Sequence, residues 1–166
     1  MSTKDNAETA FAGESQANRK YSSFSEKAAA EGYPNVAKLF KAASEAEAVH
    51  AKRLLFVLQG VGSTEENLKG SVAGETEEYE KMYPSFLKMA EEENNTEAKT
   101  VFTHAMKAEE VHAGKYEAAL KAVSEGADLS IKKVFLCPVC GNIEFDEVPA
   151  QCPICSVPAR MFKEIE

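Results

Sequence analysis

The chain has 166 residues, which is enough for one helical domain of about 130 residues and a small second domain, and too few for a barrel-sized enzyme. Asp and Glu number 27 against 19 Lys and Arg, and the formal charge of −8 without a basic cluster argues against binding to nucleic acid or an anionic membrane. Because no apolar run reaches the roughly 20 residues of a membrane span and the start lacks a secretion signal, we expect a cytoplasmic protein.

Four segments carry apolar residues at alternating steps of three and four, the pattern of a helix with one buried face. The first runs from Ala10 to Ala28 and ends at a Gly-Tyr-Pro turn, and the second runs from Val36 to Val57. The third runs from Val72 to Met89, and the fourth from Ala105 to Val123. The pattern predicts an all-α four-helix bundle over residues 1–130.

The connections between these segments suggest their pairing. Short turns join the first to the second and the third to the fourth, so each pair is predicted to be an antiparallel hairpin. The middle connection, residues 60–71, is about twelve residues long and could span roughly 40 Å when extended. That reach allows a ferritin-like crossover along the bundle, or transfer of the second hairpin to another chain.

The buried faces of the four segments are interrupted by seven carboxylates and imidazoles, each continuing the rhythm of its helix. They are Glu14, Glu47, His50, Glu75, Glu78, Glu109 and His112. Several carboxylates in one dry interior repel one another and need a counter-charge, and no Lys or Arg falls on these faces. Two divalent metal ions would supply that charge.

The spacing indicates the kind of metal site. Glu47 and His50, and again Glu109 and His112, form Glu-x-x-His pairs one helical turn apart, while the other two helices each supply a Glu. This is the ligand set of a carboxylate-bridged di-iron or di-manganese site in a four-helix bundle.

The two hairpins also read as copies of one another. Residues 46–51 recur at 108–113, offset by 62 positions, and residues 12–15 recur at 73–76, offset by 61. Glu78 breaks this symmetry, because its counterpart in the first helix is Ala17. An added carboxylate beside one metal could let that metal exchange ligands when its oxidation state changes.

Simpler interpretations exist for single residues. Any one of the glutamates could lie on a solvated helix face, and His104 points away from Glu109 and is expected to be a surface or packing residue. Tyr21 and Tyr83 lie two turns beyond Glu14 and Glu75, where they could be core aromatics or could hydrogen-bond a ligating carboxylate. Pro84 should bend the third helix.

Residues 131–166 form a different kind of domain. Four prolines fall here, and two Cys-x-x-Cys pairs, separated by eleven residues, place four thiolates on two tight turns: Cys137, Cys140, Cys152 and Cys155. In a reducing compartment such cysteines are metal ligands rather than disulfides. Spacing alone favours a structural zinc ribbon over a single rubredoxin-type iron, but a redox site upstream would need a one-electron donor, which favours iron.

Taken together, these motifs resemble the rubrerythrin family over nearly the whole chain. The resemblance is carried by AFAGESQANRKY (10–21), EAVHAKRL (47–54), AGETEEYEKMYPSF (73–86), AEEVHA (108–113), CPVCG and CPIC. It implies a ferritin-like bundle with a non-haem di-iron centre and a C-terminal rubredoxin-like domain with one mononuclear iron. The implied activity is a cytoplasmic peroxidase that reduces hydrogen peroxide to water in defence against oxidative stress.

The resemblance also implies roles for the ligands. Glu47 and Glu109 match the bridging carboxylates, Glu14 and Glu75 match the terminal ones, and His112 matches the ligand of one iron.

Glu78 and His50 match the pair between which the other iron moves on oxidation and reduction. The implied electron donor is a reduced-nicotinamide oxidoreductase, with or without a separate rubredoxin, and the implied assembly is a homodimer whose hairpins could be exchanged.

Two positions depart from the family pattern. Asn142 stands where an aromatic is common, and Ser156 replaces a Gly that adopts a left-handed turn.

Two other functions would use the same residues. A ferroxidase or oxygen-consuming di-iron oxidase shares the four helices, although its symmetric ligand set does not require Glu78. A non-enzymatic iron-binding protein with a structural zinc ribbon is the other alternative.

Overall fold

The structure is a computed structural model that describes residues 2–166. It divides into two compact units, one ending at Gly62 and one beginning at Ser63. Within residues 2–166, no helix combines the length and apolar character that crossing a bilayer requires.

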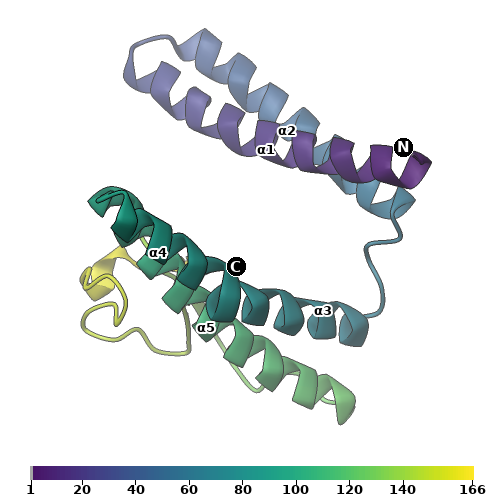
Figure 1. Cartoon of the computed structure of the whole chain (residues 1–166), viewed down its shortest axis with the longest axis vertical. Coiled ribbons are helices and arrows are strands. Elements are labelled where there is room, and N and C mark those ends of the chain that lie inside the picture. Colours follow the sequence, from purple (N-terminus) through teal and green to yellow (C-terminus); the bar gives the residue numbers. More distant parts are fainter. Residues whose placement is uncertain (1) are drawn as a thin grey trace. The chain divides into compact units, whose positions relative to one another are not determined.

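The first unit is a helical hairpin of α1 (Thr3–Ala30) and α2 (Pro34–Val57), which lie side by side and antiparallel (Figure 1). The turn between them uses Gly32 at φ 84° and places Pro34 in the first turn of α2, where its missing N–H costs nothing. Small buried side chains let the helices approach closely, and the Ser44 hydroxyl donates to the Asn18 carbonyl at 2.9 Å. The predicted first hairpin is confirmed.

The second unit begins with α3 (Thr64–Glu77), and this helix starts eight residues before the predicted Val72. The reason is a capping box: the Ser63 hydroxyl accepts from the Glu66 backbone N–H, and the Glu66 carboxylate accepts from the Ser63 N–H at 2.8 Å. The prediction of a twelve-residue connection at 60–71 is therefore wrong. The connection is residues 58–63, which can span roughly 25 Å between the helix ends.

A π-helical turn, η1 (Glu78–Met82), interrupts the predicted third helix, which continues as α4 (Tyr83–Glu92). Pro84 has no N–H to donate to the Glu80 carbonyl, so an ordinary α-helical ladder cannot continue here. Instead the Tyr83 N–H donates to the Glu78 carbonyl, five residues back. The bend that we predicted from Pro84 is thus a local widening of the helix that begins at Glu78.

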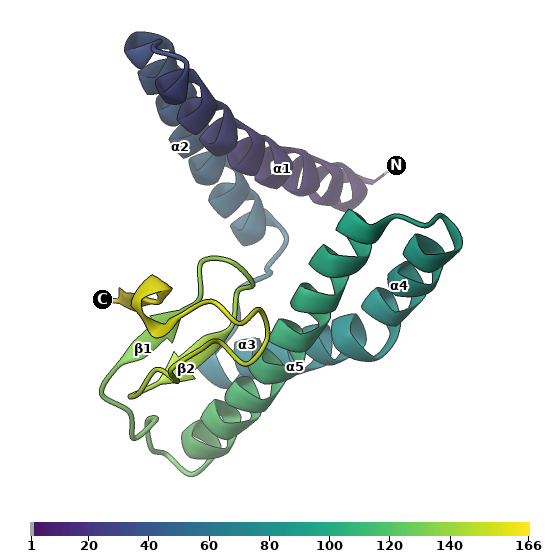
Figure 2. The same cartoon turned by 90° about the vertical axis from the view of Figure 1, so that its left-hand side faces the viewer.

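After a short turn at Asn94 and Asn95, α5 (Thr96–Ser124) packs antiparallel to α3 and α4. The chain ends in a small sheet of β1 (Val134–Leu136), β2 (Ile143–Phe145) and β3 (Lys163–Ile165), with a 3-10 turn, η2 (Ala159–Met161), before β3. Both pairings are antiparallel and the order is β2-β1-β3, so β1 is central. The sheet lies beside α5 (Figure 2), and buried cysteines form the centre of this domain.

Candidate metal centres

Three predicted ligands of the first unit lie together at the middle of the α1–α2 hairpin. Glu14 comes from α1, and Glu47 and His50 come from adjacent turns of α2; one ligand atom of each lies within 4.8 Å of the others. His50 Nδ1 lies 2.8 Å from Glu47 Oε2 and 3.9 Å from Glu14 Oε2. The His50 side chain is 54% exposed.

The second unit repeats this arrangement with Glu75 from α3 and Glu109 and His112 from α5. His112 Nδ1 lies 2.7 Å from Glu109 Oε2 and 3.9 Å from Glu75 Oε2, nearly the distances of the first group. This group is more enclosed, and the His112 side chain is only 17% exposed. Six of the seven predicted ligands therefore fall into two equivalent groups, one in each unit.

Each unit also contains a cluster of three aromatic rings, and the two clusters match. Tyr21, Phe24 and Phe40 have ring-centroid separations of 6.1, 6.3 and 5.5 Å, and their counterparts in the second unit have separations of 6.0, 6.2 and 5.6 Å. These counterparts are Tyr83, Phe86 and Phe102. The internal repeat predicted from sequence is thus present in the packing of both hairpins.

The seventh predicted ligand, Glu78, lies at the start of the π turn and is not part of the three-residue group. Burial and the nearby Glu109 raise the pKa of its carboxyl, so its side chain faces the same charges as the group. The repeat offset is 61 between Glu14 and Glu75 but 62 between Tyr21 and Tyr83, so the second unit has one inserted residue between these positions. The π turn, which begins at Glu78, accommodates the extra residue.

Carboxylates in both groups are close enough to compete for protons. In the first group, a hydrogen bond with Glu47 raises the pKa of Glu14, and the same bond lowers the pKa of Glu47. In the second group, burial and the proximity of Glu109 raise the pKa of Glu75 to about 7. Such carboxylates repel one another when both are ionised, and a bound cation relieves that repulsion.

His50 and His112 differ in the environment of the second ring nitrogen, Nε2. His112 Nε2 lies 2.9 Å from the carbonyl oxygen of Gly141, which follows Cys140 in the C-terminal domain. Because a carbonyl only accepts, Nε2 carries the proton and donates, which leaves Nδ1 facing Glu109 and Glu75. A second hydrogen bond of this kind is what orients histidine ligands in metal sites.

Besides packing in the core, Tyr21 and Tyr83 are predicted to be able to donate a hydrogen bond to a ligating carboxylate. Within residues 2–166, neither hydroxyl makes such a bond to the carboxylates of its group, so this role stays a prediction. Burial and the carboxylates Glu109, Glu78 and Glu75 raise the pKa of Tyr83, which places its phenol in their electrostatic field.

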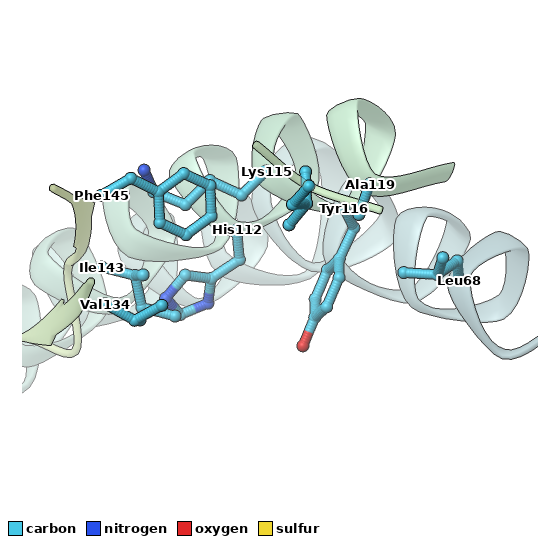
Figure 3. Close-up of a pocket in the computed structure, with 9 residues that line it drawn as sticks. Leu68, His112, Lys115, Tyr116, Ala119, Val134, Ile143 and Phe145 are labelled. Atoms are coloured by element: carbon cyan, nitrogen blue, oxygen red, sulfur yellow. The ribbon is translucent and has the colours of Figure 1, made fainter. Parts of the chain in front are cut away.

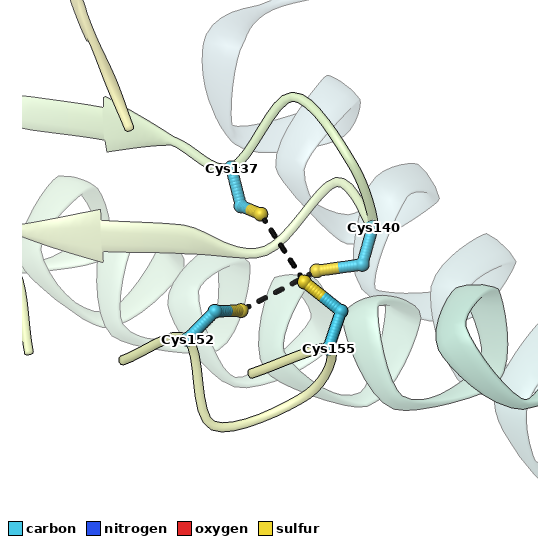
Figure 4. A group of neighbouring side chains, drawn as sticks. All are labelled: Cys137, Cys140, Cys152 and Cys155. Atoms are coloured by element: carbon cyan, nitrogen blue, oxygen red, sulfur yellow. Dashed lines mark hydrogen bonds between the residues drawn. The ribbon is translucent and has the colours of Figure 1, made fainter. Parts of the chain in front are cut away.

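The four cysteines form a third site, in the C-terminal domain. One sulfur of each lies within 4.8 Å of the others, with Cys137 and Cys155 sulfurs 3.6 Å apart and Cys140 and Cys152 sulfurs 3.5 Å apart (Figure 4). All four are free thiols. A tetrahedral metal with sulfur ligands at about 2.3 Å places its sulfurs about 3.8 Å apart, so the four positions fit such an ion.

Two matching turns hold these cysteines. The N–H of Gly141 donates to the Cys137 carbonyl at 3.0 Å, and the N–H of Ser156 donates to the Cys152 carbonyl at 2.9 Å. Both turns need a left-handed residue, and Ser156 adopts φ 64° where Gly141 adopts φ 82°.

Burial raises the pKa of the Cys140 thiol, so the thiolate form here needs a cation beside it.

Residues 5–120 match the family profile described as Rubrerythrin, and residues 135–163 match that described as Rubrerythrin, rubredoxin-like domain. The chain belongs to the rubrerythrin family. It therefore has a helical ferritin-like domain and a small rubredoxin-like domain, as predicted, together with the carboxylate and histidine residues of a di-iron site. Members of this family are oxidoreductases.

Known rubrerythrins align along almost their whole length. Rubrerythrin-2 of Clostridium acetobutylicum is 37% identical and the alignment covers 97% of this chain and 95% of that protein. Nigerythrin of Nitratidesulfovibrio vulgaris is 36% identical, with 97% and 85% covered. A solved structure described as the fully reduced, all-ferrous state of nigerythrin matches with a TM-score of 0.59 and 35% identity, covering 99% of this chain and 87% of that one.

Proposed function

We propose that this rubrerythrin is a peroxidase that reduces hydrogen peroxide to water. The observation that supports it most directly is the duplicated group of two carboxylates and one imidazole, to which only the second unit adds a fifth carboxylate, Glu78. Reduction of one peroxide consumes two electrons and two protons, breaks the O–O bond and yields two waters. When bound, a pair of iron ions supplies the two electrons, and a single iron at the four cysteines replaces them one at a time.

The proposed ligands divide between the two groups. Glu14, Glu47 and His50 would hold iron from the first unit, and Glu75, Glu109 and His112 from the second. Oxygen and imidazole donors of this kind suit iron, and the like-charged carboxylates of each group need a cation between them.

Glu78 and the histidines are proposed to make the site asymmetric. His112 is oriented by its hydrogen bond to Gly141, whereas His50 is 54% exposed and its imidazole contacts Glu47 and Glu14. Glu78 would provide an alternative oxygen ligand to the iron that His50 binds in the other oxidation state.

The length of the connection bears on the assembly. In a ferritin-like bundle the second connection runs the length of the bundle. The 24 residues of α2 are roughly 36 Å long, whereas residues 58–63 can bridge roughly 25 Å. We therefore propose a homodimer with exchanged hairpins, in which each complete site takes one ligand group from each copy.

The oxidant can be identified with the anaerobically reduced, iron-loaded protein. Hydrogen peroxide and dioxygen are added separately in a stopped-flow spectrometer, and the iron absorption is followed. Oxidation by peroxide should be at least about tenfold faster than oxidation by dioxygen. Faster oxidation by dioxygen would favour the oxidase or ferroxidase instead.

The metal at the four cysteines is tested separately, by metal analysis and visible absorption of the purified protein. Iron–thiolate absorption with about three irons per chain supports the proposal. Zinc at the cysteines would remove the proposed internal electron donor and would favour a structural ribbon.

Hairpin exchange is tested by mixing two inactive variants. E47A and E109A each damage one ligand group, so each homodimer should lack a complete site. If hairpins are exchanged, the E47A/E109A heterodimer regains one intact site and about half of the wild-type peroxide turnover. If each site belongs to one chain, every site of the heterodimer keeps one defect and no turnover returns.

The electron donor is proposed to be a reduced-nicotinamide oxidoreductase, directly or through a separate rubredoxin. A cytoplasmic location belongs to the same proposal, because a reducing compartment keeps the four thiols available for metal.

A further inference from the structure

One face of α5 meets the C-terminal four-cysteine domain. Ala108, His112, Lys115 and Ala119 follow one another at steps of four, three and four, so they form a single stripe along the helix. At one end of this stripe the backbone of Gly141 approaches Ala108 closely, since a Cβ built on Gly141 would lie 3.9 Å from the Ala108 Cβ. The helix and the domain therefore touch at the turn that carries Cys140.

Two polar contacts hold this junction within residues 2–166. The first is the hydrogen bond from His112 Nε2 to the Gly141 carbonyl, at 2.9 Å. The second is the Lys115 ammonium, which lies 3.9 Å from the centroid of the Phe145 ring at the end of β2. A cation at that distance over an aromatic face is attracted by the ring's negative face.

The packing around these contacts is incomplete. An apolar cavity of about 280 Å³ lies between α5, the start of α3 and the sheet. Figure 3 shows His112, Lys115 and Phe145 at one end of the cavity, with Ile143 and Val134 beside them and Leu68 at the other end. The cavity leaves this part of the junction between helix and sheet without apolar packing, so the two polar contacts beside it contribute more to its stability.

We propose that Lys115 is a positioning residue: its ammonium lies over the Phe145 ring and holds the four-cysteine domain where the Gly141 carbonyl accepts the hydrogen bond from His112 Nε2. Lys115 lies one turn beyond His112 on the same stripe, so the two contacts fix the domain at two adjacent points. Without Lys115 the cavity end beside His112 opens more readily, and the imidazole loses its partner more often. The value of this contact for peroxide reduction depends on the proposed function, but the contact itself does not.

The test follows the His112 Nε2 proton by NMR in the full-length, 15N-labelled protein loaded with zinc. Exchange of this proton with solvent reports how often the hydrogen bond to Gly141 opens. K115M keeps most of the aliphatic stem and removes the charge, and it should speed exchange by at least about threefold. K115R keeps a cation over the ring and should restore slow exchange.

The chain offers a matched control. Lys133 lies 5.9 Å from the Phe135 ring, but this pair belongs to the four-cysteine domain and does not reach α5. K133M should therefore leave the exchange of the His112 proton unchanged. Equal exchange in K115M and the wild type, or an equal acceleration by K133M, would overturn the proposal.

Zinc–thiolate absorption in the ultraviolet checks that each variant keeps its folded four-cysteine domain. If K115M loses that absorption, F145L decides, since it removes the ring and keeps an apolar side chain at the same position. Faster exchange in F145L supports the proposal, and wild-type exchange rejects it. None of these measurements involves peroxide, so a failed peroxidase assay would reject the proposed function and leave this result standing.

Discussion

Replacing Ser156 by Gly should stabilise the four-cysteine domain. Ser156 occupies the left-handed region at φ 64°, where a Cβ costs an L-residue about 1–2 kcal/mol, and the matching turn already has Gly141. Glycine also makes the unfolded chain more flexible, which offsets about 0.4–1 kcal/mol. The net gain for S156G is therefore about 0.5–1 kcal/mol.

The reverse change, G141S, should lose a similar amount. A Cβ at Gly141 would meet Ala108 at 3.9 Å, an ordinary contact, so the loss comes from the backbone conformation rather than from a clash. Both variants are measured by equilibrium denaturation of the metal-loaded protein, followed through the metal–thiolate absorption. S156A is the control, because it removes the hydroxyl and keeps the Cβ. If S156G were no more stable than S156A, left-handed strain would not explain the effect.

Three further predictions concern the second unit. E78A should keep both metals bound but lower peroxide turnover about tenfold or more. E80A, at an exposed neighbouring position, should leave turnover unchanged. Loss of metal from E78A would give Glu78 a different role. S63A should destabilise the protein by about 1 kcal/mol in denaturant unfolding, because it removes the cap of α3, whereas S71A inside the helix should cost less. Hydrogen bonds from Ser63 lower the pKa of Glu66, so their contribution to the stability of the fold is present above the carboxyl's ordinary pKa and is lost as pH falls through the lowered value. E66Q should therefore differ from the wild type in melting temperature at pH 7 and converge with it in acid. A difference that stays constant with pH would contradict this.

Three helices and the ligand groups could be predicted from sequence because each depends on local periodicity. Glu47 with His50, and Glu109 with His112, lie one turn apart in any regular helix, so their spacing already places them on one face. The hairpin turn at Gly32 is equally local, since a left-handed glycine followed by Pro ends one helix and starts the next.

The start of α3 was missed because its first turns carry almost no apolar residues. Between Thr64 and Ser71 only Leu68 is a large apolar side chain, so a search for buried stripes finds nothing to follow. The signal that could have located the helix is the Ser-x-x-Glu pattern of Ser63 and Glu66, which satisfies the free N–H groups at the N-terminus without any burial.

The π turn could also have been predicted, from the offsets of the internal repeat. Glu14 and Glu75 are offset by 61 positions, whereas Tyr21 and Tyr83 are offset by 62, so one residue has been inserted between them. A regular helix would rotate everything after the insertion by about 100° and break the match between the aromatic clusters. The clusters match to within 0.1 Å in their ring separations, so the helix absorbs the extra residue in a π turn.

The contact between His112 and Gly141 could not be predicted, because a backbone carbonyl has no sequence signature and the two residues are far apart in the chain. It nevertheless explains a difference between histidines with the same local motif. An imidazole whose second nitrogen is held loses little orientational freedom when it binds a metal, and so is suited to be a permanent ligand. His50 contacts Glu47 and Glu14 through Nδ1, and under the proposed function Glu78 would be the alternative ligand to it. Both the π turn and the carbonyl on His112 belong to the second unit, so the two ligand groups differ in their surroundings although their local motifs are nearly identical.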